Sequence, residues 1–70
     1  MNKITATFSN GQTINRTSAK AYSHAYRAEN IYQSHTGFAS SAKQAESAAR
    51  AAFRGCPKAH TVEVVETAML

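Results

Sequence analysis

The chain of 70 residues contains no aspartate, one cysteine, one proline and three isolated glycines. Four scattered glutamates offer no pair for general acid–base catalysis, which needs converging ionisable groups. The histidines lack metal-ligand spacing and the cysteine has no companion, so no zinc motif is present. Gly11, Gly37 and Gly55 lie too far apart to form a phosphate-binding loop. We therefore expect a protein that is not an enzyme, with no catalytic residue, no metal site and no cofactor.

Cys56 is the one candidate nucleophile, because Arg54 and Lys58 lie next to it in the sequence. It follows the end of an expected helix, however, where the helix dipole disfavours a thiolate. We favour the alternative, in which Cys56 is a small apolar residue in a turn.

Large apolar residues are also scarce. Leu, Ile, Val and Phe together number 10 of 70, whereas 14 residues are alanine. A chain of this length buries only about 60% of the surface that it exposes when unfolded. Residues 1–70 are therefore expected to form a single domain with a thin core, which a partner or self-association would stabilise.

No apolar run approaches the roughly 20 residues of a membrane span, and Met1–Phe8 lacks the apolar stretch of a signal peptide. One cysteine cannot form an internal disulfide, which is typical of a cytoplasmic protein. We expect no membrane partner.

Positive charge dominates the chain, with a formal net charge of +4. Residues 1–58 contain all eight lysines and arginines but only two glutamates, and residues 59–70 contain the other two glutamates. A basic body favours nucleic acid, anionic lipid or an acidic protein surface as a partner. A charged surface that only maintains solubility is the alternative.

The first third of the chain predicts a β-hairpin. Lys3–Phe8 alternates polar and apolar residues, and Gln12–Thr17 follows after Ser-Asn-Gly. A three-residue loop with Gly11 in the left-handed conformation would pair Ala6 with Ile14 and keep the apolar residues on one face. A two-residue turn would place Ile14 on the opposite face, so we prefer the longer loop.

Residues 18–34 fit either a helix or a strand. A helix would begin with a poor N-cap, and Glu-Asn in its middle suits a turn better than a helix interior. We prefer a strand over Tyr22–Ala28, a turn at Glu29-Asn30 and a weaker strand over Ile31–Phe38.

The clearest element is a helix between Ser41 and Gly55. Ser41 and Gln44 form a capping-box pattern at its start. Gly55 suits a left-handed C-cap, and Pro57 prevents the helix from continuing. At about 100° per residue, one side gathers small apolar residues and Phe53, namely Ala42, Ala45, Ala48, Ala49, Ala52 and Phe53.

The opposite side of this helix carries Lys43, Arg50 and Arg54, and Glu46 can pair with Arg50 at the i, i+4 spacing. After the helix, His60–Thr67 predicts a strand with two valines on one face. These elements predict an α+β fold, a small antiparallel sheet of four to five strands with one helix packed on one face, in the order ββ(ββ)αβ. The other face would be solvated, dimeric or a binding surface.

Two candidate binding sites follow. Lys43, Arg50 and Arg54 span about three helical turns, a length that could follow a phosphate backbone or an acidic groove. An ordinary solvated helix face is the alternative. Lys20, Tyr22 and Tyr26 could present aromatic rings on the open sheet face to stack on bases, or the tyrosines could belong to the core.

Residues 37–49 (Gly-Phe-Ala-Ser-Ser-Ala-Lys-Gln-Ala-Glu-Ser-Ala-Ala) resemble the entry to the last helix of double-stranded-RNA-binding domains. That family places a lysine-rich segment before an Ala-Ala helix to bind phosphates. Ser41, Lys43 and Ala45 match it, whereas Ala42 and Glu46 stand where the family has lysines. The resemblance implies a shared way of docking an alanine-rich helix.

In size, charge and architecture the sequence resembles the small proteins that phages and mobile elements encode, among them anti-CRISPR proteins. Those proteins inhibit a CRISPR effector by occupying the surface where it takes its DNA. The resemblance implies a non-enzymatic inhibitor that docks on a bacterial protein or nucleoprotein complex in the cytoplasm of a bacterial host. A nucleic-acid-binding module that uses the basic helix face is the alternative, and a structural homodimer is a second one.

Overall fold

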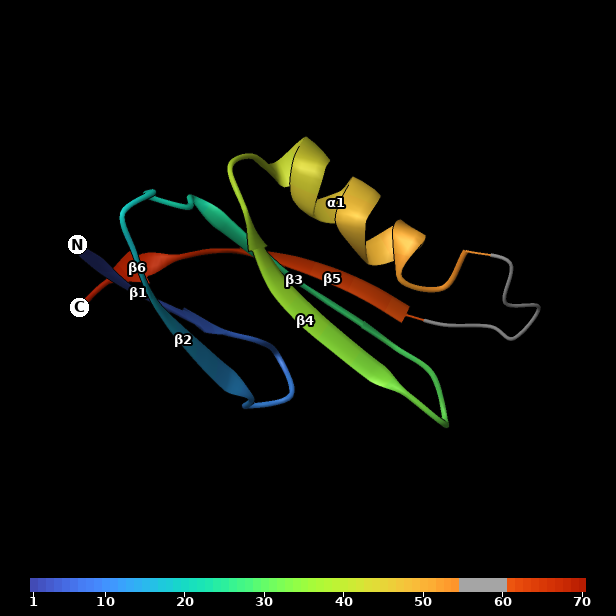
Figure 1. The fold of residues 1–70 in the computed structure, drawn as a ribbon. Coiled ribbons are helices and arrows are strands. Elements are labelled where there is room, and N and C mark those ends of the chain that lie inside the picture. Colours follow the sequence, from blue (N-terminus) through green and yellow to red (C-terminus); the bar gives the residue numbers. More distant parts are fainter. Residues whose placement is uncertain (55–60) are drawn as a thin grey trace.

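The computed structural model describes residues 1–54 and 61–70, which form an α+β fold of six strands and one helix (Figure 1). The elements follow in the order β1 (Asn2–Thr7), β2 (Thr13–Ser18), β3 (His24–Glu29), β4 (Ser34–Ala39), α1 (Ala42–Ala51), β5 (Thr61–Glu66) and β6 (Ala68–Met69).

The strands form two antiparallel sheets of three strands each, in the orders β2-β1-β6 and β4-β3-β5. The expected single sheet of four to five strands is therefore wrong. The final segment runs as β5 beside β3, passes through Thr67 and continues as β6 beside β1 (Figure 1). The Thr67 amide donates to the Ser23 carbonyl at 3.0 Å, directly after the last residue pair of the β3–β5 ladder. The next residue, Ala68, already pairs with β1.

The β1–β2 hairpin confirms the expected register. Ala6 lies opposite Ile14, and Gly11 has a φ of 87°. The Phe8 amide donates to the Gln12 carbonyl at 2.8 Å, which closes the three-residue loop. Period-two alternation then buries Ile4, Ala6 and Phe8 together on one side of the sheet.

Two strands also form in the ambiguous region, with later boundaries than expected. β3 begins two residues after Tyr22, and β4 begins three residues after Ile31. The turn lies at residues 30–33, because the Asn30 side-chain oxygen accepts from the amides of Tyr32 and Gln33, both at 2.8 Å. The Asn30 amide in turn donates to the Gln33 carbonyl at 2.9 Å, which extends the ladder past Glu29.

The N-cap of α1 is confirmed, since Ser41 Oγ accepts from the Gln44 amide at 3.1 Å. The Gln44 side chain accepts from the Ser40 amide at 3.3 Å, one residue before the N-cap. The helix ends earlier than expected, with its C-cap at Ala52.

The cause of this earlier end is a change in hydrogen bonding. The amides of Phe53 and Arg54 donate to carbonyls three residues back, at 3.3 and 3.2 Å, which tightens the final turn. The expected caps at Gly55 and Pro57, and the turn at Cys56, lie outside the described residues.

The second sheet packs on both faces. Ala28, Ala49 and Phe53 form one cluster under α1, with Tyr26 and Val62 against it. On the other face a second cluster joins the two sheets and consists of Ala6, Phe8, Ala25, Ile14, Phe38 and Val65. The expectation that the face opposite the helix is open is therefore wrong, because the β1–β2 hairpin packs on it.

Alanines allow α1 to lie close to the sheet. Ala45 and Ala49 on the helix and Ala28 on β3 have no solvent exposure. Small side chains on both surfaces leave little space between backbone layers, so the core is thin but closely packed. The helix Ala42–Ala51 therefore packs on the sheet through alanine methyl groups rather than through large side chains.

Gly37 on β4 lies directly opposite Tyr26 on β3, and the tyrosine side chain lies over it. A Cβ atom at Gly37 would come within 2.5 Å of Tyr26 Oη and 2.6 Å of its Cζ. The ring occupies the space that a side chain would fill, which anchors Tyr26 beneath α1.

We expect Gly37→Ala to lower the free energy of unfolding by about 1–3 kcal/mol, because the added methyl group displaces a packed ring. Urea denaturation measures this change. Ser34→Ala, on the exposed end of the same strand, is the matched control and should alter stability by about 0.5 kcal/mol or less. In a Tyr26→Leu background the effect of Gly37→Ala should shrink. An equal effect in both backgrounds would contradict the ring contact.

Candidate functional site

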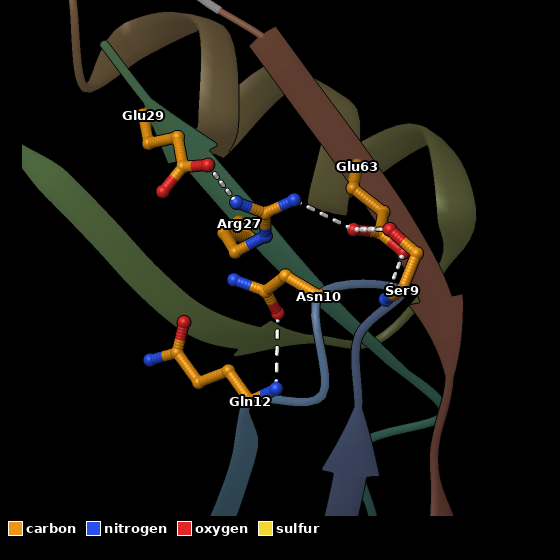
Figure 2. A network of polar contacts seen from close by, with 6 residues as sticks. All are labelled: Ser9, Asn10, Gln12, Arg27, Glu29 and Glu63. Atoms are coloured by element: carbon orange, nitrogen blue, oxygen red, sulfur yellow. Dashed lines mark hydrogen bonds and ion pairs between the residues drawn. The ribbon is translucent and has the colours of Figure 1, made fainter. Parts of the chain in front are cut away.

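A network of polar contacts is centred on Arg27 (Figure 2). This β3 side chain is 8% exposed and forms ion pairs with Glu29 on its own strand and with Glu63 on β5. The Glu63 pair joins Arg27 Nη2 to Glu63 Oε1 at 3.0 Å. Glu63 also accepts from the Ser9 amide at 2.8 Å and from Ser9 Oγ at 3.0 Å. The loop of the first sheet is thereby tied to the second sheet.

The ionisation of this group follows from its contacts. The hydrogen bond from the Ser9 amide is the main cause that lowers the pKa of Glu63, and Arg27 adds to it against the opposing effect of burial. Hydrogen bonds to Glu29 and Glu63 raise the pKa of Arg27. Both partners are therefore held in their charged forms. The contacts of Ser9, Arg27 and Glu63 therefore join the two sheets.

The three cations of the basic helix stripe are exposed but differ in their contacts. Arg50 donates from Nε and Nη2 to one oxygen of Glu46, at 3.1 and 2.8 Å. Lys43 lies in the first turn of α1, and Arg54 lies beyond its C-cap. Within residues 1–54 and 61–70, Lys43 and Arg54 form no ion pair. The helix thus presents one unpaired cation, Lys43, and a second, Arg54, lies just beyond its end.

Tyr22 and Tyr26 do not share a surface. Tyr26 packs on the helix side of the second sheet, whereas the Tyr22 ring lies 6.2 Å from that of Phe38, which packs on the other side. The alternation that would have aligned them fails because Tyr22 precedes β3. Both side chains are half-buried, so an open aromatic platform is not present in this region.

The Tyr22 ring instead forms cation–π contacts with two side chains. The guanidinium carbon of Arg16 lies 5.0 Å from the centre of the Tyr22 ring, and Lys20 Nζ lies 5.4 Å from it. Sequence reasoning named Lys20 and Tyr22 but missed Arg16. The hairpin register contained the signal, because it pairs Arg16 with Ile4 and so places this cation on the inner side of β2.

The charges of the described residues divide into two groups. Three glutamates form ion pairs with Arg27 or Arg50, and Glu66 remains without one. Five exposed cations have no ion pair in the same part of the chain, namely Lys3, Arg16, Lys20, Lys43 and Arg54. Among the described residues, Glu66 is thus the one glutamate without an ion pair beside five exposed, unpaired cations.

No group of three side chains in residues 1–54 and 61–70 is arranged to hold a metal ion. The helix α1 is too short and too polar to cross a membrane. Comparisons with protein-family models, with curated proteins and with solved structures find no match for this chain.

We expect Glu63→Gln to lower the free energy of unfolding at pH 7 by about 1–3 kcal/mol, since charge-assisted hydrogen bonds to Ser9 and Arg27 are weakened. The pKa of Glu63 is lower in the folded state than its ordinary value of 4.5. Its stabilising effect is therefore fully present above pH 4.5 and disappears as the pH falls through the folded pKa.

Urea denaturation at pH 7, 5 and 3 tests this expectation. The difference between wild type and Glu63→Gln should shrink at the lowest pH. Glu66→Gln is the matched control on the same strand, because Glu66 forms no ion pair in the described residues. If both substitutions changed the free energy of unfolding equally at pH 7, the stabilising role of the Glu63 contacts would be contradicted.

Proposed function

We propose that this protein is a small non-enzymatic binding protein that docks on a bacterial nucleoprotein complex and blocks its nucleic-acid or partner surface. In this role it would act as an inhibitor of the kind that phages and mobile elements encode. The observation that carries the proposal is the division of charge in residues 1–54 and 61–70. Three of the four glutamates are paired internally, and five exposed cations are left for an anionic partner.

A second feature favours a protein surface within that complex. Ile31 and Tyr32 are 85% and 66% exposed at the turn between β3 and β4. The Asn30 side chain stabilises this turn by accepting hydrogen bonds from the amides of Tyr32 and Gln33. In a chain with few large apolar residues, two of them at a fixed, projecting turn suit insertion into an apolar depression of a partner.

We expect the tagged protein to retain a stoichiometric nucleoprotein complex from bacterial lysate at low salt, identified by mass spectrometry. Lys43→Glu together with Arg54→Glu should reduce recovery about tenfold or more, because reversed charges repel an acidic surface. The matched control, Lys43→Arg with Arg54→Lys, keeps both charges and should behave as the wild type. Recovery of no stoichiometric partner, or equal recovery by the reversed variant, would overturn the proposal.

Direct binding of nucleic acid is the second candidate function, and the cations gathered on Tyr22 favour it. The basic helix stripe supports it less, because Glu46 already neutralises Arg50. The homodimer hypothesis depended on an open sheet face, and Ala6 and Phe8 of the same chain pack on that face.

A further inference from the structure

We propose that Arg16, Lys20 and Tyr22 form a binding site for the phosphate backbone of a nucleic acid. The site lies on β2 and on the connection from β2 to β3 (Figure 1). It rests on the proposed function, because the nucleic acid of the complex would be its ligand. Its test uses bare oligonucleotides, so it can succeed or fail apart from the pull-down.

The first argument is that two unpaired cations contact the same aromatic ring. Both Arg16 and Lys20 lie within the roughly 6 Å range of a cation–π contact to one ring. No carboxylate of the described residues forms an ion pair with either cation. The ring attracts each cation, but it does not neutralise them. Phosphates of a nucleic-acid backbone that passes this ring would give each cation a charge-assisted hydrogen bond.

The second argument is that the site is already ordered. The Lys20 amide donates to Ser18 Oγ at 3.1 Å, which sets the path of the chain leaving β2. The Tyr22 carbonyl accepts from Thr67 Oγ1 at 2.7 Å, which fixes the backbone of the ring-bearing residue to the C-terminal segment. A site held in this way loses little conformational entropy when it binds.

A third argument concerns the neighbourhood. Ser23 Oγ donates to the Ser40 carbonyl at 2.8 Å, and Ser40 leads directly into α1. Lys43, an unpaired cation, lies in the first turn of that helix. The connection that carries the site is therefore bonded to the segment that starts the helix, so a strand bound at Arg16 and Lys20 could continue toward Lys43.

The chemistry favours nucleic acid over an acidic protein surface. A guanidinium presents a planar fork of donors that suits a carboxylate and a phosphate equally. Its flat face can also stack on a base, which only a nucleic acid supplies. Phe38 lies on the Tyr22 ring at 6.2 Å and supports it from within the core. Tyr22 thus positions the cations rather than offering a free face to a base.

Fluorescence anisotropy with a labelled single-stranded 20-mer and a 20-base-pair duplex of mixed sequence tests the site. We expect binding at low salt, and a loss of about tenfold or more for Arg16→Ala with Lys20→Ala. The slope of log affinity against log salt should fall by about 1.4 on the single strand and about 1.8 on the duplex, as expected for two lost phosphate contacts. The tighter of the two probes identifies the form of nucleic acid that the site prefers.

The matched control is Lys3→Ala with Arg54→Ala, which removes the same charge from two other exposed, unpaired cations. It should weaken binding clearly less than the Arg16 and Lys20 pair. Arg50→Ala should change the slope little, because Glu46 already pairs with it. Circular dichroism verifies the fold of every variant, and the ring signals of Tyr22 in NMR should shift on titration.

Two outcomes would overturn the proposal. In the first, neither probe binds at low salt, which would leave an acidic protein surface as the partner of these cations. In the second, both double variants weaken binding equally while the Tyr22 signals stay unchanged, which would indicate general charge attraction with no defined site. In either case the pull-down remains an independent test of the docking function.

Discussion

The fold depends on the contact by which Glu63 joins the two sheets. The second sheet buries one of its faces under α1, whereas its other face and the inner face of the first sheet are buried only against each other. Glu63 binds the loop of the first sheet through Ser9 and the central strand of the second through Arg27. Beside this contact Phe8 lies under Arg27, with the guanidinium carbon 6.0 Å from the ring centre. Polar and apolar contacts thus hold the sheets together at the same place.

This use of charge shapes the surface as well as the interior. The carboxylates that hold Arg27 and Arg50 are no longer available to balance the remaining cations. Structural stability and an electropositive exterior therefore arise from the same pairing. Such a surface attracts an anionic partner by electrostatic steering. Salt screens this attraction, so it contributes most to association at low ionic strength.

Local patterns in the sequence predicted local structure well. The loop of the first hairpin follows from alternation and from Gly11, and the start of α1 follows from Ser41, since each depends on residues only a few positions apart. The pairing of Arg27 with Glu63 joins residues 36 positions apart, so it depends on the β3–β5 register and has no local signature. The division into two sheets depends on the path through Thr67, which no residue pattern marks.

The candidate site was predictable to a similar extent. Lys20 and Tyr22 stand out as a cation and an aromatic residue in a polar stretch, but their neighbour Arg16 comes from another strand. The hairpin register, which sequence alone supports, already places Arg16 opposite Ile4 and could have led to it. The expectation that Tyr22 and Tyr26 share an open face is wrong because Tyr22 precedes β3, whereas the alternative of a tyrosine in the core fits Tyr26.

The β5–β6 segment has a consequence for the order in which the molecule assembles. The hairpins β1–β2 and β3–β4 need only neighbouring residues, so each can form early and on its own. The segment 61–70 pairs with β3 and then places Met69 opposite Ile4 across nearly the whole chain. Closing such a long loop is slow compared with forming a hairpin. We therefore expect the segment 61–70 to pair last, after the two hairpins have formed.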